Sequence, residues 1–348
     1  MSASFALAGK HLCALLTEAG VPGVAAAAIH GPGAADETLF TAGHLKRGSP
    51  ESVDTRTAFE TGSVTKPLTA LLLAEMAVRG EVNLTDPVTR HLPPHARPRR
   101  DDPPITLGEL ATHTGGTPRL PREIYCRMAM RRSAGPYAGY TRADLYRATA
   151  RIRRRRAAGP PRYSTFGFAL LGEVLAEVAG TGYPQLLAER VLRPLGMADS
   201  GVPPAGDPAT RAATGHRRGR PVPPWRFDAI AGAGGLRASA ADLLSYLRAQ
   251  VRPEEAGWPL AEAVLATHVP RYSMAASAEG PAMALAWGHR VTRGHTLLWH
   301  TGGTGGFTAF VGFSPTAQAG VAVLANVTPT RGQPVLRAAR RLLREVVG

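Results

Sequence analysis

The chain has 348 residues, of which 44% are hydrophobic and 19% are charged. This balance is typical of a folded globular protein and excludes a disordered chain. No stretch approaches ~18 uninterrupted apolar residues, so no transmembrane helix is expected. The N-terminus lacks the cationic start and the clean apolar run of a secretion signal. We therefore expect a cytoplasmic protein of one large domain, or of two lobes that share a core.

The net charge of +15 raises the question of an anionic partner. The densest basic run, RATARIRRRRAAGPPR, holds seven arginines between Arg147 and Arg162. A solvated surface segment is the simplest interpretation, and attraction of an anionic substrate or an acidic carrier partner is the alternative. Aromatic residues make up only 6% of the chain and do not alternate with these arginines, so nucleic-acid binding is not expected.

Two cysteines, Cys13 and Cys126, lie far apart, and neither belongs to a spacing typical of metal ligands. We interpret them as buried free thiols, because the expected compartment keeps thiols reduced. The sequence predicts neither a metal nor any other cofactor.

The first elements in chain order are two short apolar runs, residues 21–30 and 37–45, separated by GPGAAD, which predicts a β-hairpin. From residue 65 to residue 79 apolar positions recur at helical spacing, and Gly80 follows as a stop signal. This helix is expected to bury one face, which carries Leu68, Leu71, Leu72 and Met76.

The middle of the chain, about residues 90–225, is rich in proline, glycine and arginine and contains one clear helical pattern at 166–180. A further helix is predicted at 239–251. There Ser239 is placed to cap the first turn and Asp242 to complete the capping arrangement.

The last part of the chain is rich in β-forming residues, in the runs HTLLWH, TAFVGFS and AGVAVLANV, and ends in an amphipathic helix. The buried side of this helix is predicted to carry Val335, Leu336, Leu342, Leu343 and Val346. Two strands near the start and three near the end predict an α+β fold with one antiparallel sheet built from both chain ends, flanked by helices. We expect a single domain, with a sheet lobe of about residues 1–60 and 230–348 and an inserted, mainly helical lobe of about residues 65–230.

Ser63 and Lys66 lie three residues apart at the start of the helix predicted for residues 65–79, so their side chains share one face. A serine hydroxyl becomes a good nucleophile when a neighbouring base takes its proton. A buried lysine can lose its charge and act as that base, whereas arginine stays protonated. Lysine is rare here, at Lys10, Lys46 and Lys66 among 41 basic residues, so this position indicates a need for a neutral amine. The spacing alone is weak evidence, since a solvated lysine is the ordinary alternative.

Two further segments strengthen the case. PPRYSTFGFALLGEVLAEVAG contains Tyr163, and LLWHTGGTGGFTAFVGFSP contains His300 and the glycines that follow it. Together with TLGELATHTGGTPRL and AGAGGLRASAADLLSYL, they resemble the serine β-lactamase and penicillin-binding-protein-like family, especially its class C and esterase branch. The resemblance extends from about residue 20 to residue 330 and implies the fold of that family and an acyl-enzyme mechanism.

The resemblance also implies roles for the matching residues. Ser63 matches the acylated nucleophile, and Lys66 matches the lysine that helps to activate it. Tyr163 matches the tyrosine that acts as general base or relays a proton to the leaving group and from the incoming acceptor. Gly303 follows the third motif, where a backbone N–H completes the oxyanion hole with that of the nucleophile. His113, in THTGG, matches a position that is structural in the family.

Two positions depart from the pattern of the β-lactamases. Thr165 stands where the second motif usually has asparagine, which weakens recognition of an acylamino group. His300 opens the third motif, followed by Thr301 and Gly302, where β-lactamases carry a lysine for the substrate carboxylate. These four residues are the candidate substrate-binding residues, and a His-Thr-Gly motif is similar to that of the esterases of the family. The glycines from 302 to 306 are interpreted as room for the substrate backbone.

The leading hypothesis is a serine hydrolase or acyltransferase that acts on an ester or amide of a small molecule, in which water, an amine or an alcohol accepts the acyl group. Transacylation in natural-product metabolism is one form of it. The first alternative is a β-lactamase or D-amino-acid-directed peptidase with altered substrate recognition. The second is a non-catalytic binding protein for an anionic partner.

Overall fold

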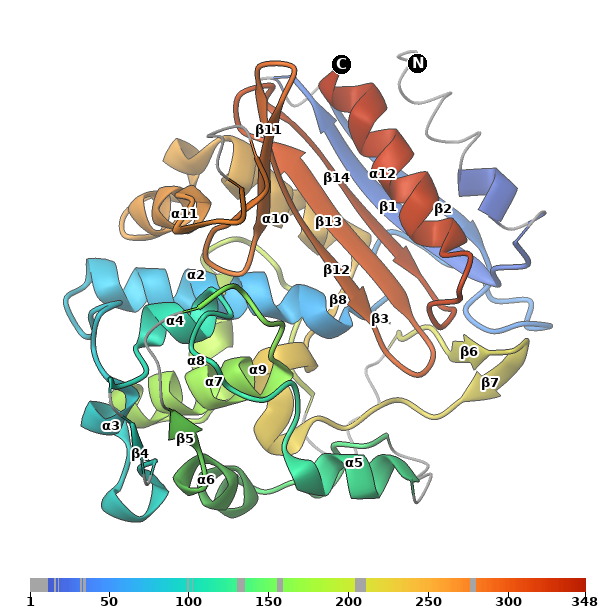
Figure 1. Ribbon diagram of the computed structural model, residues 1–348. Coiled ribbons are helices and arrows are strands. Elements are labelled where there is room, and N and C mark those ends of the chain that lie inside the picture. The colour runs from blue at the N-terminus through green and yellow to red at the C-terminus, as the bar shows by residue number, and fades with distance from the viewer. Residues whose placement is uncertain are drawn as a thin grey trace.

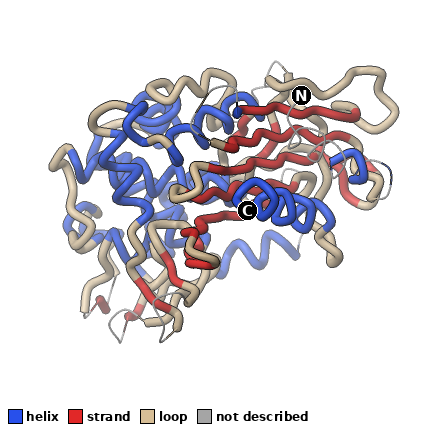
Figure 2. The backbone as a smooth tube through the Cα atoms, turned by 90° about the horizontal axis from the view of Figure 1, so that it is seen from above, coloured by secondary structure: helices blue, strands red, loops and turns tan. Residues whose placement is uncertain are grey.

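The computed structural model describes residues 12–348 except 16, 18, 32, 34–35, 99, 102, 130–134, 155–158, 204–210 and 276–279. The arginine run seen in the sequence therefore lies partly outside the described residues. Within them the chain has the predicted α+β architecture (Figure 1). Seen from above in Figure 2, most strands gather on one side of the molecule and most helices on the other.

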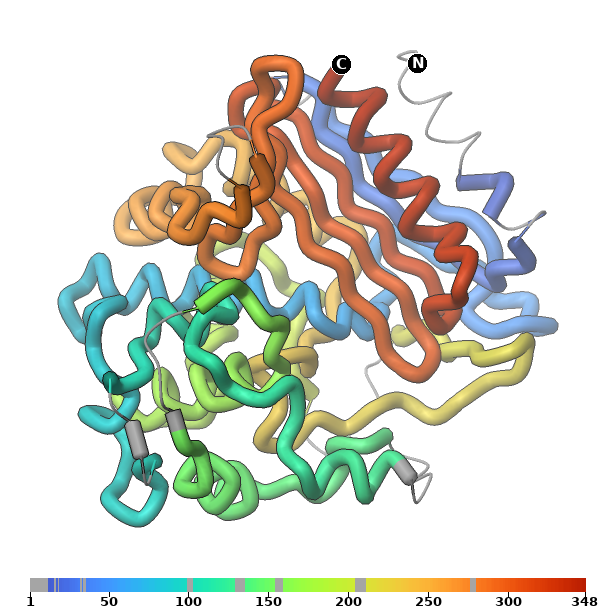
Figure 3. Tube along the Cα trace, in the orientation of Figure 1, coloured from blue at the N-terminus to red at the C-terminus, as the bar shows by residue number. Residues whose placement is uncertain are grey.

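The main sheet is antiparallel and has the order β2-β1-β14-β13-β12-β11-β10-β9. Its strands are β1 (Gly23–His30), β2 (Glu37–Gly43), β9 (Tyr272–Ser273), β10 (Ala282–Met283), β11 (Gly288–Thr292), β12 (His295–Gly303), β13 (Thr308–Ser314) and β14 (Ala319–Ala325). Strand β1 pairs with β14, which places the N-terminal hairpin beside the C-terminal strands (Figure 3). The prediction of one sheet from both chain ends is confirmed. The three strands β9, β10 and β11 were missed, because two of them are only two residues long.

Each face of this sheet contributes to a different core. Along β14, Val323 belongs to a smaller core and the next residue, Leu324, to a larger one, as expected for alternating side chains. Helix α12 (Pro334–Val347) covers the smaller core, and its buried side contains all five predicted residues together with Ala339. Helix α10 (Ala240–Val251) packs against the opposite face through residues such as Leu247.

The remaining helices form the second half of the molecule. They are α2 (Thr65–Val78), α3 (Val88–His91), α4 (Leu107–Ala111), α5 (Arg122–Ala129), α6 (Arg142–Ala150), α7 (Thr165–Ala179), α8 (Tyr183–Leu187), α9 (Ala231–Gly234) and α11 (Leu260–His268), with the short turns η2 (Gly62–Val64), η3 (Pro94–Ala96), η4 (Ala188–Leu192), η5 (Asp228–Ile230) and η6 (Pro253–Ala256). Paired short strands are β3 (Phe59–Glu60) with β8 (Arg237–Ala238), β4 (Arg100–Asp101) with β5 (Arg153–Arg154), and β6 (Gly215–Arg217) with β7 (Arg220–Val222).

Helix α2 has the predicted bounds but a different environment. It was expected to bury one leucine face, yet every residue from Thr65 to Met76 is buried. The helix lies between the sheet and the other helices (Figure 1), so protein surrounds it on all sides. This position matters for function, because it removes Lys66 from solvent.

Two smaller expectations need correction. Ser239 caps α10 by accepting from the Asp242 N–H, but the Asp242 carboxylate accepts from the Ser200 hydroxyl at 2.6 Å instead of returning to the cap. Both cysteines are free, as predicted, but both are exposed. Neighbouring apolar residues, Leu12 beside Cys13 and Ile124 near Cys126, occupy the buried positions instead.

Candidate active site

Ser63 lies in the short turn η2, directly after strand β3 and before helix α2. The preceding residue, Gly62, has a φ of 52°, a conformation that favours glycine. This sharp turn ends the strand and begins the helix within three residues. As a result Ser63 is half-buried at the N-terminal end of a fully buried helix.

The amine of Lys66 is enclosed beside the serine. Its side chain is fully buried, and Nζ donates to Ser63 Oγ at 2.9 Å and to the carbonyl oxygen of Ala233 at 2.6 Å. Burial lowers the pKa of Lys66 well below its usual value, and the positive charge of Arg119 lowers it further. Both effects favour the neutral amine over the ammonium, which is the state that the sequence argument required.

Tyr163 reaches the same oxygen from the other side. Its hydroxyl donates to Ser63 Oγ at 2.6 Å, and Lys66 Nζ lies 4.9 Å from the centre of its ring. Burial raises the pKa of Tyr163 to about 12, although the bond to Ser63 and the charge of Arg119 act in the opposite direction. Ser63 Oγ thus stands between an amine with a lowered pKa and a phenol with a raised one.

A hydrogen-bonded network fixes the segment that carries Tyr163. The ring of His113 lies 4.7 Å from that of Tyr163, and its Nδ1 accepts from the Ser164 N–H at 3.1 Å. The Ser164 hydroxyl caps α7 by accepting from the Gly167 N–H, and it donates to the carbonyl oxygen of Pro118. His113 therefore has the positioning contact that suits the structural role expected for it.

Strand β12 passes directly against the turn of the nucleophile. A Cβ atom added to Gly302 would lie 1.9 Å from the carbonyl oxygen of Thr61, and one added to Gly62 would lie 2.7 Å from the nitrogen of Gly303. These glycines are therefore required by contact between two backbones of the protein itself. Gly305 is required by a side chain instead, because an added Cβ would lie 2.4 Å from the indole nitrogen of Trp225. These contacts give Gly62, Gly302 and Gly305 a reason within the protein itself, and the role of the glycines as room for the substrate backbone stays a prediction.

The hydrogen-bond pattern of β12 and β13 gives the direction of the Gly303 N–H. Thr304 N donates to the carbonyl oxygen of Phe307 at 3.0 Å, so these two residues form a hydrogen-bonded pair. In an antiparallel ladder the next pair, Gly303 and Thr308, is then not hydrogen-bonded. The Gly303 N–H therefore points away from β13, toward the turn that holds Gly62 and Ser63.

His300 lies on the same face of β12 as Gly302 and is almost fully buried. Its Nδ1 donates to the carbonyl oxygen of Thr301 at 2.8 Å, and its ring centre lies 6.3 Å from that of Tyr163. Burial is the main cause that lowers the pKa of His300 to about 3, with a smaller contribution from Lys66 when its amine is protonated, so the imidazole is neutral at physiological pH. The third motif thus provides no cation.

The two remaining predicted residues, Thr301 and Thr165, have no hydrogen bond to Ser63 Oγ among the described contacts. Alternation along β12 places the side chain of Thr301 on the opposite face of the sheet from His300. Thr165 begins α7 and is half-buried, and its N–H donates to the carbonyl oxygen of Arg119. The geometry therefore brings together Ser63, Lys66, Tyr163, His300, Gly302 and Gly303.

Arg119 is a site residue that the sequence reasoning missed. It is exposed, and its guanidinium lies 5.4 Å from the centre of the Tyr163 ring. Its charge acts on both Lys66 and Tyr163. The signal was present in the motif TLGELATHTGGTPRL, in which the arginine follows the segment that supports Tyr163.

Comparison with known proteins agrees with this geometry. The model of the family described as Beta-lactamase matches residues 9–345. The chain belongs to the Beta-lactamase family. The resemblance inferred from the motifs is therefore confirmed, and with it a β-lactamase-like fold and the broad activity of the family, serine hydrolysis of an amide or ester bond.

Three relatives illustrate the range of this family. The chain is 28% identical to the D-alanyl-D-alanine-carboxypeptidase/endopeptidase AmpH of Escherichia coli, over 77% of this chain and 70% of the relative. It is 27% identical to a Beta-lactamase of Pseudomonas fluorescens, over 82% and 84% of the two chains. It is 26% identical to the Unguisins hydrolase ungD' of Aspergillus campestris, over 88% and 59%.

Two further features bear on the chemistry of this Beta-lactamase-family chain. Within the described residues, no group of three histidine, cysteine or carboxylate side chains is arranged to hold a metal ion. None of the described helices combines the length and apolar character that a bilayer-spanning helix needs.

Proposed function

We propose that the chain is a serine acyl-enzyme catalyst that cleaves an ester, or less readily an amide, of a small molecule and passes the acyl group to water, an amine or an alcohol. The observation that carries this proposal is the pair of hydrogen bonds on Ser63 Oγ, from Lys66 Nζ at 2.9 Å and from Tyr163 at 2.6 Å. A surface serine without function has no need for a buried amine and a half-buried phenol on the same oxygen.

The two pKa shifts support a division of labour between these groups. The lowered pKa of Lys66 favours the neutral amine, which takes the proton of Ser63 as Oγ bonds to the substrate carbonyl carbon. The pKa of Tyr163 is raised to about 12, so its hydroxyl is protonated at neutral pH. It gives this proton to the leaving oxygen as the carbonyl–oxygen bond breaks. The resulting ammonium and phenolate stabilise each other, because Lys66 Nζ lies 4.9 Å from the Tyr163 ring centre.

The second half of the reaction reverses these transfers. An acceptor hydroxyl or amine gives a proton to the Tyr163 oxygen and attacks the acyl carbon, and Ser63 Oγ regains its proton from Lys66 as the ester bond to the enzyme breaks. In both halves the carbonyl oxygen accepts from the N–H groups of Ser63 and Gly303, the donors aimed at the developing charge. All protons are then back in their starting positions.

A neutral third motif favours an ester over a β-lactam. The carboxylate of a β-lactam is bound most simply by a cation, and burial keeps His300 uncharged at this position. Thr165 offers only a short hydroxyl for an acylamino group. The printed names of AmpH and the Pseudomonas enzyme nevertheless support a second candidate, cleavage of a β-lactam or a D-alanyl peptide. Turnover of a chromogenic cephalosporin faster than of any ester would favour that candidate.

The proposal is tested by turnover of p-nitrophenyl butyrate with and without an added primary amine. A burst of nitrophenolate equal to the enzyme concentration, followed by a slower steady state, is expected for an acyl-enzyme. An amide product formed at the expense of butyrate identifies acyl transfer, and butyrate alone identifies hydrolysis. No release of nitrophenolate above that of Ser63→Ala would contradict the proposal.

The role given to Tyr163 makes a separate prediction. Replacement by phenylalanine should lower kcat for an alkyl ester by about a hundredfold, because an alkoxide must be protonated as it leaves. Acylation by the p-nitrophenyl ester should fall much less, since nitrophenolate leaves without a proton. Rates measured on matched alkyl and nitrophenyl esters check this, and an equal loss on both would mean that Tyr163 does not protonate the leaving group.

A further inference from the structure

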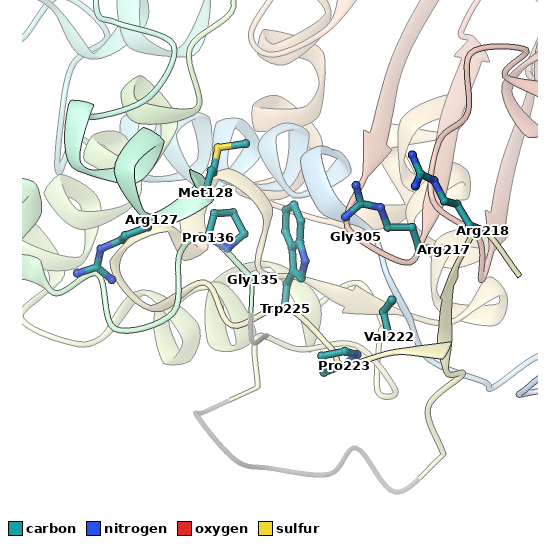
Figure 4. Close-up of a pocket in the computed structure, with 10 residues that line it drawn as sticks. All are labelled: Arg127, Met128, Gly135, Pro136, Arg217, Arg218, Val222, Pro223, Trp225 and Gly305. Atoms are coloured by element: carbon teal, nitrogen blue, oxygen red, sulfur yellow. The ribbon is translucent and has the colours of Figure 1, made fainter. Parts of the chain in front are cut away.

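A cavity of about 550 Å³ lies beside the turn between β12 and β13 (Figure 4). Apolar side chains make up much of its described lining, and Trp225 stands at its centre in the close-up. The others are Met128, Pro136, Val222 and Pro223. Gly305 also lines it, two residues after the Gly303 that faces the nucleophile.

The wall of this cavity is fastened to the catalytic segment. Glu60, three residues before Ser63, accepts from the Trp225 N–H at 2.7 Å and also bonds the Thr304 side chain. Glu60 is only 4% exposed, so these bonds are shielded from water. Trp225 is thereby held between the chain just before the nucleophile and the chain just after Gly303. The cavity and the nucleophile are therefore parts of one rigid arrangement.

The position of the cavity indicates which part of a substrate it would take. Tyr163 protonates the leaving oxygen in the proposed mechanism, so the leaving group lies on the Tyr163 side of Ser63. The described lining of the cavity contains Gly305 and Trp225 but neither Tyr163 nor Lys66. The cavity therefore lies on the other side of the oxyanion site, where the acyl chain extends.

Three arginines also line this cavity, and they differ in their partners. Arg127 donates to the carbonyl oxygens of Ala138 and Gly139, so its guanidinium already binds backbone groups of the protein. Arg217 and Arg218 are exposed at the tip of the β6–β7 hairpin, and no described carboxylate pairs with either. The described lining contains no acidic residue. The described lining thus combines apolar side chains with two guanidinium groups that pair with no described carboxylate.

From this arrangement we infer that the cavity binds an acyl chain with a terminal anionic group, and that Arg217 and Arg218 bind that group. The substrate class is an ester whose acyl part has an apolar body and a distal carboxylate or similar anion. Guanidinium groups suit such an anion because each offers two parallel N–H donors. This inference rests on the proposed acyl-enzyme function and adds the identity of the acyl group to it.

The test compares p-nitrophenyl monoesters of adipic, pimelic and suberic acid with the same compounds methylated at the far carboxylate. At the best chain length, kcat/KM should be ~10-fold higher for the anion, mainly through KM. The double variant Arg217→Gln, Arg218→Gln should bring this ratio close to one, by lowering kcat/KM for the anionic ester more than for its methylated counterpart. Turnover of the neutral ester in all variants tests the acyl-enzyme function independently.

Arg220 provides the matched control. It belongs to the same hairpin and has the same charge, but it is not among the described residues that line the cavity. Arg220→Gln should retain the preference for the anionic ester. A ratio near one at every chain length in the wild type would overturn the inference, as would an equal loss of preference in Arg220→Gln, which would mean that overall positive charge attracts the substrate.

Discussion

Replacement of Lys66 by methionine is expected to lower kcat for ester cleavage by about a thousandfold while the protein remains folded. Methionine fills a similar volume, but its thioether sulfur is far too weak a base to take the proton of Ser63. The Lys66 amine is fully buried and no described carboxylate pairs with it, so no buried charge pair is broken by the change. Pre-steady-state release of nitrophenolate measures the loss directly, and circular dichroism confirms folding. Acylation within tenfold of the wild-type rate would exclude Lys66 as the base.

The same variant has a predictable effect on the pH dependence of stability. Burial depresses the pKa of Lys66 below 10.5, so between the folded and the unfolded pKa the unfolded chain holds the extra proton. The contribution of Lys66 to the free energy of unfolding is therefore largest above pH 10.5, and it is lost as the pH falls toward the pKa of the folded protein. Relative to Lys66→Met, the wild type should gain stability as the pH rises toward 10.5, by up to about 1.4 kcal/mol per pH unit.

Lys46→Met is the control for this measurement. Lys46 is exposed, so the same substitution there should leave the difference from wild type independent of pH. Urea titrations of the three proteins at several pH values give the comparison. If the free energies of unfolding of the wild type and Lys66→Met changed in parallel with pH, the pKa of Lys66 would not be lowered in the folded protein.

Replacement of Gly302 by alanine is the second change with a large expected effect. The added Cβ would lie 1.9 Å from the carbonyl oxygen of Thr61, a backbone atom that cannot turn aside. Strand β12 and the turn η2 must therefore separate, which moves the Gly303 N–H away from Ser63. We expect kcat/KM to fall at least about a hundredfold, as for loss of an oxyanion donor, together with a loss of stability of a few kcal/mol.

Gly201→Ala is a suitable comparison for this variant. Gly201 also pairs with a neighbouring chain segment, at Arg237, and has an ordinary φ, but an added Cβ there meets no atom within 4 Å. It should keep both activity and stability. If Gly302→Ala matched it, the close approach of β12 to the nucleophile would have no part in catalysis. Steady-state kinetics and thermal unfolding of both variants decide between these outcomes.

The sheet and the long helices could be predicted because their patterns are local. The hairpin of β1 and β2, the helix α7 that ends at Gly180, and the buried side of α12 all follow from residue spacing and from stop signals. Several short helices escaped prediction because they are too short to show periodicity. Two of them had a usable signal, since Thr106 with Glu109 and Thr141 with Asp144 form capping boxes at the starts of α4 and α6.

The burial of α2 could not be predicted in the same way. An amphipathic pattern indicates which face is apolar, but only tertiary packing determines whether Lys66 on the opposite side and the polar residues Thr65 and Thr69 are also enclosed. Thr69 is accommodated because its hydroxyl donates to the carbonyl oxygen of Gly232 and contacts the hydroxyl of Tyr183. A few such partners, distant in sequence, convert a surface helix into a central one.

Part of the candidate site could be predicted from the sequence for a related reason. Ser63 and Lys66 are three residues apart on one helix, so their proximity is a local property. Tyr163 and Gly303 reach the same place only through the fold, and it was the resemblance to a family that linked them. Arg119 and Trp225 were missed because their positions depend on backbone contacts, such as the bond from the Trp225 N–H to Glu60.

The central claim is that Ser63 carries the acyl group, and intact-protein mass after brief exposure to an activated short-chain ester tests it most directly. The wild type should gain the mass of one acyl group, and Ser63→Ala should gain none, because it keeps the surrounding site but lacks the nucleophilic oxygen. Peptide mapping should place the added mass at Ser63. Equal labelling of both proteins, or ester turnover by Ser63→Ala at the wild-type rate, would contradict the account.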